Sequence, residues 1–270
     1  MCARMTTGYP GRNFGRRSVY LDVMTILAPG VATVGTDPGT AEDLRKNILS
    51  TYFTLRLGIV ILSLALPLVL YFGGKLHGIP LADSMSAYYG EHHGEMRNWF
   101  VGILWTIGSF LYLYKGFSPL ENILLNLAGG FAVAVAMVPC NCWTDAQGPG
   151  NKLHGFVAVS FFVTMALVCL LCATDTIPLL PNKADQDAFR RRYHAIGIVL
   201  VLSPLAAIGV SYVLDRHNSY KFFIEAFAVW TFAFYWWTKS REFKITSAEK
   251  KALEGRLQRR AGAREVYEAK

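Results

Sequence analysis

Long apolar runs constrain the fold of this chain more than any other feature of its sequence. Hydrophobic residues make up 53% of the 270 residues and charged residues only 17%, a low charged fraction for a soluble domain. Because a helix needs about 20 mostly apolar residues to cross roughly 30 Å of hydrocarbon, we predict a polytopic helical membrane protein. A transmembrane barrel is not expected, since the alternating strands that it needs are not seen. The predicted spans cover residues 57–72, 99–114, 123–138, 153–173, 195–214 and 222–237.

The expected fold is an all-α bundle of six transmembrane helices over residues 49–243. Before it lies an arm, residues 1–48, which is expected to be largely disordered apart from a short helix over TAEDLRKN at 40–47. After it, residues 244–270 form a basic tail that is predicted to be partly helical. Within the bundle, the small residues AGG at 128–130 suit a close contact between two helices.

The distribution of Lys and Arg predicts which side of the membrane each loop faces, because cytoplasmic loops collect basic residues. With the N-terminus inside, 22 of the 27 basic residues fall on the cytoplasmic side and five on the other. We therefore expect both termini in the cytoplasm. The net charge of +8 then follows from this topology and from contact of the basic tails with anionic lipids of the inner leaflet, without a nucleic-acid partner.

Titratable groups gather on the predicted outer side. The segment DSMSAYYGEHHGEMRNW at residues 83–99 lies there, between the first two spans. Two interpretations stay open: the segment forms the rim of an outward-facing pocket, or it is an interfacial loop whose Tyr88, Tyr89 and Trp99 belong to an aromatic belt. Five of the six histidines share this side: His77, His92, His93, His154 and His217.

Two ionisable residues fall at or within predicted spans. His154 opens the fourth span, and Glu225 lies a little over one turn into the sixth. A carboxylate inside a transmembrane segment is costly and marks a functional site by default. The alternatives are that Glu225 ties two helices together through hydrogen bonds, and that loop backbone satisfies His154.

The motif EHHGE at residues 91–95 is a weak metal signal. Adjacent histidines on a helix point about 100° apart, so at most one of them joins His154 in a site. His93 and His154 are therefore reserve metal ligands only. A divalent metal such as zinc stays open as a cofactor, although the ligand set that zinc needs is incomplete.

The motif CNC at residues 140–142 faces the predicted outer side. It is open to a disulfide with another chain, a local disulfide, free thiols or a metal. Cys169 and Cys172 are expected to be small apolar residues of the fourth span. The sequence contains no GxSxG nucleophile elbow, Walker loop or HExxH motif.

In their order along residues 50–243, these segments resemble the Frag/DRAM/Sfk family of six-helix membrane proteins. The likeness is strongest to the branch that remodels GPI lipids and to its bacterial homologues, while EHHGE and CNC depart from the family pattern. The segments that carry the resemblance are DSMSAYY, RNWFVGILWTIGSFLYLYKG, ENILLNLAGGFAVAVAMV, KLHGFVAVSFF and DRHNSYKFFIEAFAVWTFAFYWW.

The resemblance implies work on or around lipids at the outer or lumenal leaflet. With the placement of polar groups on that side, it makes Ser86, His154 and Glu225 the catalytic candidates. The candidates for contacts with the substrate are Ser84, Tyr88, Asn126, His217 and Asn218.

Three functions are compatible with this pattern. The first is a membrane-embedded lipid hydrolase or acyl-transfer enzyme, in which His154 and Glu225 act as base and acid or as metal ligands. The second is a non-catalytic lipid-binding or regulatory protein, and the third is a small-solute transporter. The expected location is the inner membrane of a bacterium, or an endomembrane or the plasma membrane of a eukaryote. The oligomeric state stays open.

Overall fold

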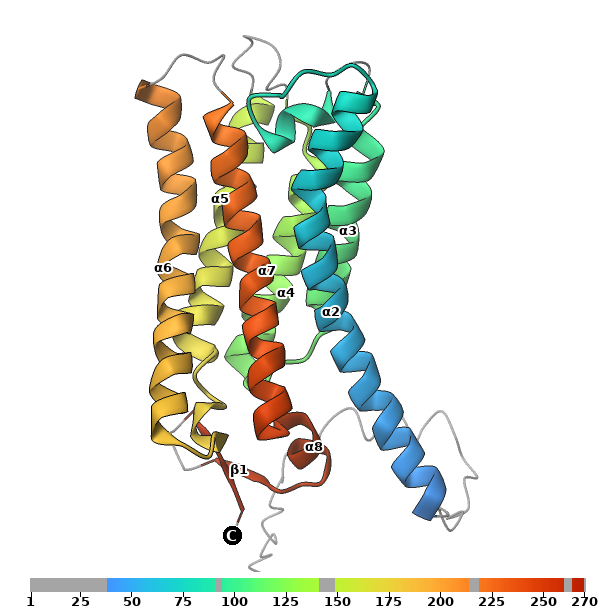
Figure 1. Ribbon diagram of the computed structural model, residues 1–270, viewed down its shortest axis with the longest axis vertical. Coiled ribbons are helices and arrows are strands. Elements are labelled where there is room, and N and C mark those ends of the chain that lie inside the picture. Colours follow the sequence, from blue (N-terminus) through green and yellow to red (C-terminus); the bar gives the residue numbers. More distant parts are fainter. Residues whose placement is uncertain (1–37, 91–93, 141–148, 214–218, 260–263, 270) are drawn as a thin grey trace, which may run out of the picture. The chain divides into compact units, whose positions relative to one another are not determined.

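The computed structural model describes residues 38–90, 94–140, 149–213, 219–259 and 264–269 (Figure 1). The chain divides into two compact units, residues 1–43 and 44–270, and the helical bundle belongs to the second. Six long helices make up most of the described part: α2 (Pro38–Leu76), α3 (Arg97–Leu113), α4 (Pro119–Met137), α5 (Pro149–Leu167), α6 (Lys183–Val213) and α7 (Tyr220–Thr246).

Shorter elements connect and extend these helices. A 3₁₀ helix η1 (Met85–Tyr89) precedes α3, and a π-helical turn η3 (Val168–Cys172) continues α5. The turn η4 (Ile177–Leu179) leads into α6. After α7 come the short helix α8 (Ala248–Leu253) and an antiparallel hairpin of β1 (Leu257–Arg259) and β2 (Val266–Glu268). The predicted all-α class is confirmed for the bundle.

Within the described residues, four helices are long and apolar enough to cross a membrane. The surface of α2 shows why this fits an integral membrane protein. Its exposed residues Leu57, Ile61 and Leu64 are as apolar as its buried residues Ile59 and Leu66, and a helix that is apolar all round has no face suited to water. The four candidate spans are Gly39–Leu76, Pro119–Met137, Asn151–Cys172 and Lys183–Val210.

Consecutive helices pack side by side from α3 to α7. The helix α2 joins the two ends of this series. Its Gly58 leaves room for Phe110 of α3, since a Cβ there would lie 2.5 Å from the Phe110 ring. On its other side, the indole of Trp230 in α7 donates to the Leu64 carbonyl at 3.3 Å.

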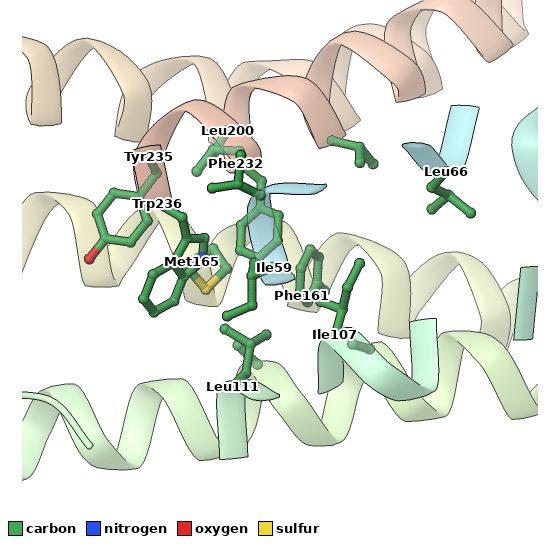
Figure 2. Packing of buried hydrophobic residues seen from close by; sticks show 14 of the residues in the cluster. Ile59, Leu66, Ile107, Leu111, Phe161, Met165, Leu200, Phe232, Tyr235 and Trp236 are labelled. Carbon is green, nitrogen blue, oxygen red and sulfur yellow. The ribbon is translucent and has the colours of Figure 1, made fainter. Parts of the chain in front are cut away.

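Helices α3 and α4 approach each other closely where Gly108 faces Gly129. A Cβ added to Gly129 would lie 2.6 Å from the Gly108 carbonyl oxygen. Gly129 is the middle residue of the AGG run, so the predicted close contact is confirmed. Large side chains fill the interior beside it: Figure 2 shows Phe161 and Met165 of α5 near Phe232 and Trp236 of α7.

The predicted start of the first long helix is wrong. The helix α2 begins at Pro38, so the expected separate helix at 40–47 is its first part. The reason is that no proline or glycine interrupts residues 40–57, and half of these residues are strong helix formers such as Ala, Glu, Leu, Lys and Arg. In the tail, α8 ends before Gly255, whose φ is +67°, and the chain then forms the hairpin, which was not predicted.

Candidate functional site

The segment η1 lies at the end of the bundle where α3, α5 and α7 begin. Ser84 precedes η1 in an extended conformation, and its Oγ accepts from the Ala87 amide at 3.2 Å, as an N-cap does. Tyr88 is fully buried, and its ring leaves no space for a Cβ at Gly74 of α2. The Phe222 amide of α7 donates to the Asp83 carbonyl at 3.0 Å. These contacts fix the backbone of η1 and hence the position of Ser86.

Ser86 meets His154, and their side chains form the central contact of the site. The distance from Ser86 Oγ to His154 Nε2 is 2.8 Å. The other ring nitrogen, Nδ1, lies 2.7 Å from the carbonyl oxygen of Val138, the residue that follows α4. A carbonyl only accepts, so Nδ1 of the neutral ring carries the proton and Nε2 accepts from the serine hydroxyl. This is the arrangement of a nucleophile, a base and a group that orients the base.

Helical spacing explains why His154 points inward. Val157 and Phe161, three and seven residues further along α5, are also buried, and residues at this spacing share one face of a helix. His154 is only 4% exposed, whereas Ser86 is half-buried. The base is therefore shielded, and the serine is accessible from the cavity described next.

Glu225 reaches the same segment from the second turn of α7. Its Oε2 accepts from the Met85 amide at 2.8 Å. This hydrogen bond ties η1 to α7 and sets the backbone directly before Ser86. It matches the alternative that Glu225 joins two elements of the bundle, and it also places a carboxyl group beside the Ser86–His154 pair.

A cavity of about 200 Å³ opens beside these residues. The polar side chains of its lining come from four elements, η1, α5, α6 and the start of α7. The rest of the lining is mainly apolar. Such a cavity suits a ligand with an apolar body and a polar group near Ser86. The polar side chains that line it are Ser86, Asn151, His154, Ser203, Lys221 and Glu225.

The structure thus brings Ser86, His154 and Glu225 to one cavity. Two candidates for substrate contacts have structural roles instead: Ser84 caps η1 and Tyr88 packs beneath it, and neither lines the cavity. Asn126 of α4 lies away from the cavity lining, with its Oδ1 buried and without a hydrogen-bond partner among the described residues. His93, His217 and Asn218 lie outside the described residues.

Three polar residues of the cavity were not predicted from the sequence: Ser203, whose position carries no signal, and the pair Asn151 and Lys221. Asn151 precedes His154 by three residues, and Lys221 precedes Glu225 by four. On a helix this spacing places both members of each pair on one face. The spacing was therefore the signal that could have found Asn151 and Lys221.

The hydrogen bonds of His154 bear on the zinc hypothesis. The Nε2 atom contacts Ser86 and Nδ1 contacts the Val138 carbonyl, an orientation that suits the ring both as a base and as a metal ligand, whose second ring nitrogen commonly donates to a carbonyl. Across the residues that the structure describes, no group of three or more His, Cys, Asp or Glu side chains could hold a metal ion.

The cysteines divide between the two ends of the bundle. Cys140, near the end with η1, is buried and disulfide-bonded. Cys169 and Cys172 are buried free thiols in the π-helical turn, as expected for small apolar residues. Cys142 lies outside the described residues.

A second polar cluster lies at the opposite end, around Lys239 and Glu242 of α7. The Lys239 ammonium donates to Glu242 Oε2 at 3.2 Å, to the Ala173 carbonyl at 3.0 Å and to Thr176 Oγ1 at 2.9 Å. The hydroxyls of Thr176 and Tyr193 both donate to Glu242. The sixth span was predicted to end at residue 237, which placed Lys239 among the basic residues of the cytoplasmic side, and that boundary is wrong because Lys239 lies within α7 and is fully buried in the bundle.

The tail is held at this same end, where α8 and β1 appear in Figure 1. Arg56 of α2 pairs with both carboxylate oxygens of Glu249 in α8. The Val266 amide of β2 donates to the Asp175 carbonyl at 2.8 Å. Burial raises the pKa of the Asp175 side chain, and its Oδ2 has no hydrogen-bond partner among the described residues.

Comparisons with family models, with curated proteins and with solved structures find no match. A function is therefore inferred from the geometry of the cavity and of the residues that line it.

Proposed function

We propose that the protein is a membrane enzyme that cleaves or transfers a lipid acyl ester, with Ser86 as nucleophile and His154 as general base. The observation that carries the proposal is the 2.8 Å contact between Ser86 Oγ and His154 Nε2 at the polar end of an apolar cavity. The carbonyl of Val138 orients the imidazole from its other side. Serine hydrolases and acyl transferases need this relation of nucleophile, base and orienting group.

The proposal includes all six long helices as membrane spans. Support for α7 comes from its exposed face, on which Phe223, Phe227, Trp230 and Phe234 follow one another at intervals of three or four residues. This spacing makes a continuous apolar stripe along the helix. The 17 residues of α3 span roughly 26 Å at 1.5 Å per residue, which is close to the thickness of the hydrocarbon core.

The proposal places the Ser86 end of the bundle at the outer leaflet. The lopsided distribution of basic residues supports this orientation. The disulfide of Cys140 gives independent support, because disulfides persist in oxidising compartments outside the cytosol. Both termini then lie on the cytoplasmic side.

In the proposed reaction, Ser86 Oγ attacks the ester carbonyl carbon while His154 Nε2 takes the hydroxyl proton. The carbon–oxygen bond to the alcohol part then breaks, and His154 returns the proton to the leaving oxygen. Water or a second alcohol attacks the acyl group on Ser86 in the same way, which restores the free serine. Lys221 supplies positive charge where the tetrahedral oxyanion or a headgroup phosphate carries negative charge.

Glu225 acts in this proposal as a positioning residue, because its hydrogen bond goes to the backbone of Met85. Replacing it by Gln keeps a possible acceptor for the Met85 amide, whereas replacing it by Ala removes that acceptor. Labelling of Ser86 is therefore expected to survive Glu225→Gln and to slow in Glu225→Ala.

A serine-directed probe tests the proposal. The purified protein is treated with diisopropyl fluorophosphate, which reacts with activated serines, and the modified residue is located by peptide mass spectrometry. We expect the label on Ser86, and His154→Ala should slow labelling by about 100-fold or more. Ser203→Ala is the matched control, because Ser203 lines the same cavity but donates to its own helix, to the Val199 carbonyl. An unlabelled Ser86, or labelling that His154→Ala leaves unchanged, contradicts the proposal.

The second candidate is a non-catalytic lipid-binding protein, and the mostly apolar lining of the cavity favours it. It predicts that a defined lipid co-purifies in equal amount with the wild type and with Ser86→Ala. Recovery of such a lipid without any label on Ser86 would select this function over the enzyme.

A further inference from the structure

An apolar groove runs along the outer surface of α6 and α7, next to the cavity. Its volume is about 560 Å³. Two of its residues, Ser203 and Ile224, also line the cavity, so the groove and the cavity meet at these side chains. The groove residues are Val199, Leu202, Ser203, Ala206, Val210, Tyr220, Phe223, Ile224 and Phe227.

The wall between groove and cavity is made of small side chains on α6. Ala206 lines the groove and the next residue, Ala207, lines the cavity, so the same turn of α6 borders both spaces. Pro204 in the same turn has no amide hydrogen and cannot make a helical hydrogen bond. The hydroxyl of Ser203 is bonded back to the Val199 carbonyl at 2.7 Å, so it does not project a free donor into the groove.

The groove opens on the face of the bundle that a bilayer would cover. Leu202, Phe223 and Phe227 are 55%, 57% and 57% exposed. Side chains of this size and exposure suit contact with hydrocarbon and not with water. A chain that lies in the groove is therefore a neighbour of the lipid tails around the protein.

We propose that the groove between α6 and α7 admits the acyl chain of a membrane lipid, so that the substrate class is long-chain acyl esters and not water-soluble short-chain esters. The inference rests on the proposed function, since it places the ester group of that lipid at Ser86. The occupant is assigned as a lipid because the combined space is lined mainly by apolar side chains, while its charged and titratable groups gather with Ser86 at the cavity end, around His154 and Lys221. Its acyl chain lies past Ile224, between α6 and α7.

A photoreactive phospholipid tests this placement. The protein is reconstituted in lipid nanodiscs with a phosphatidylcholine that carries a diazirine at the end of one acyl chain, and cross-linked residues are mapped after illumination. Cross-links are expected on groove residues of α6 and α7, such as Leu202 and Phe223. Ala206→Trp fills the groove and should reduce these cross-links about tenfold. Leu205→Trp is the control, because Leu205 is an exposed neighbour that lines neither space.

Labelling of Ser86 with the small probe diisopropyl fluorophosphate is measured in the same variants. Normal labelling with few groove cross-links in Ala206→Trp supports the inference, because a small probe does not need the groove. Cross-links spread evenly over all exposed helix faces, or equal cross-linking in the two Trp variants, overturn it while the enzyme proposal stands. Groove cross-links without any labelling of Ser86 overturn ester chemistry and support the groove as a lipid site.

Discussion

Lys239 and Glu242 form an ion pair inside the bundle, and removal of one partner should destabilise the protein strongly. Lys239→Met removes three hydrogen bonds of the ammonium, to Glu242, Thr176 and the Ala173 carbonyl. It leaves the carboxylate of Glu242 fully buried without its cation. Breaking a buried pair in this way costs about 3–5 kcal/mol, and for a domain of this size that lowers the Tm by roughly 10 °C.

The buried thiols Cys169 and Cys172 provide the assay. A dye that becomes fluorescent on reaction with thiols reports unfolding when these two residues become exposed on heating, in a Cys2→Ser background. Lys244→Met is the control, because Lys244 lies exposed on the same helix and its loss should change the free energy of unfolding by less than about 0.5 kcal/mol.

A double substitution separates pairing from packing. In Lys239→Met with Glu242→Gln no unpaired charge remains, so this protein should be more stable than Lys239→Met alone, within about 2 kcal/mol of the wild type. The reasoning is refuted if the effects of Lys239→Met and Glu242→Gln on the free energy of unfolding simply add in the double variant, or if Lys239→Met costs less than about 1 kcal/mol. Either result would show that the cluster does not act as a coupled ion pair.

Three further predictions use the same unfolding assay or proteolysis. Gly129→Ala should lower the free energy of unfolding by about 1–3 kcal/mol, because the new Cβ meets a carbonyl of α3. Gly130→Ala is the control: open space surrounds Gly130, so this change should leave stability unchanged or raise it. Equal effects of the two changes would contradict the close contact. Arg56→Ala should free α8 from its pairing with Glu249 and speed tryptic cleavage of the tail about tenfold, and an unchanged rate would mean that other contacts hold the tail. Burial raises the pKa of Asp175, so the folded state favours the protonated acid and loses stability as pH rises through that pKa. Asp175→Asn should therefore raise the Tm at pH 7, and this gain should shrink towards pH 4; a gain that does not depend on pH would exclude titration of Asp175 as its cause.

The helices were predictable because their apolar runs are long, and the common location of Ser86 and His154 followed from the alternation of spans. Ser86 was named as the catalytic serine, but the sequence pattern alone does not explain why Ser86 and not Ser84 meets the histidine. Ser84 and Ser86 are two residues apart in the sequence. In the 3₁₀ turn, the Ser84 hydroxyl accepts from the Ala87 amide, whereas Ser86 faces the cavity. The partner of His154 Nδ1 is the backbone carbonyl of Val138, and a backbone acceptor carries no signal in the sequence.

The position of Lys239 was misjudged for a different reason. A count of basic residues treats every lysine near a helix end as part of a loop, and it has no means to recognise a buried one. The available signal was Glu242 three residues later, since oppositely charged residues at this spacing pair on a helix. The hairpin in the tail was missed because each strand has only three residues and depends on contacts such as that of Val266 with Asp175.

The pairing of Arg56 with Glu249 also sets an order of events during biosynthesis. The two residues are 193 positions apart, and ribosomes add roughly 5–20 residues each second. About 10–40 s therefore pass between the synthesis of the Arg56 guanidinium and that of its carboxylate partner, while the helices between them are made. The arginine belongs to the first described helix and its partner to one of the last described elements, so their contact forms late and closes this end of the bundle after the helices have assembled.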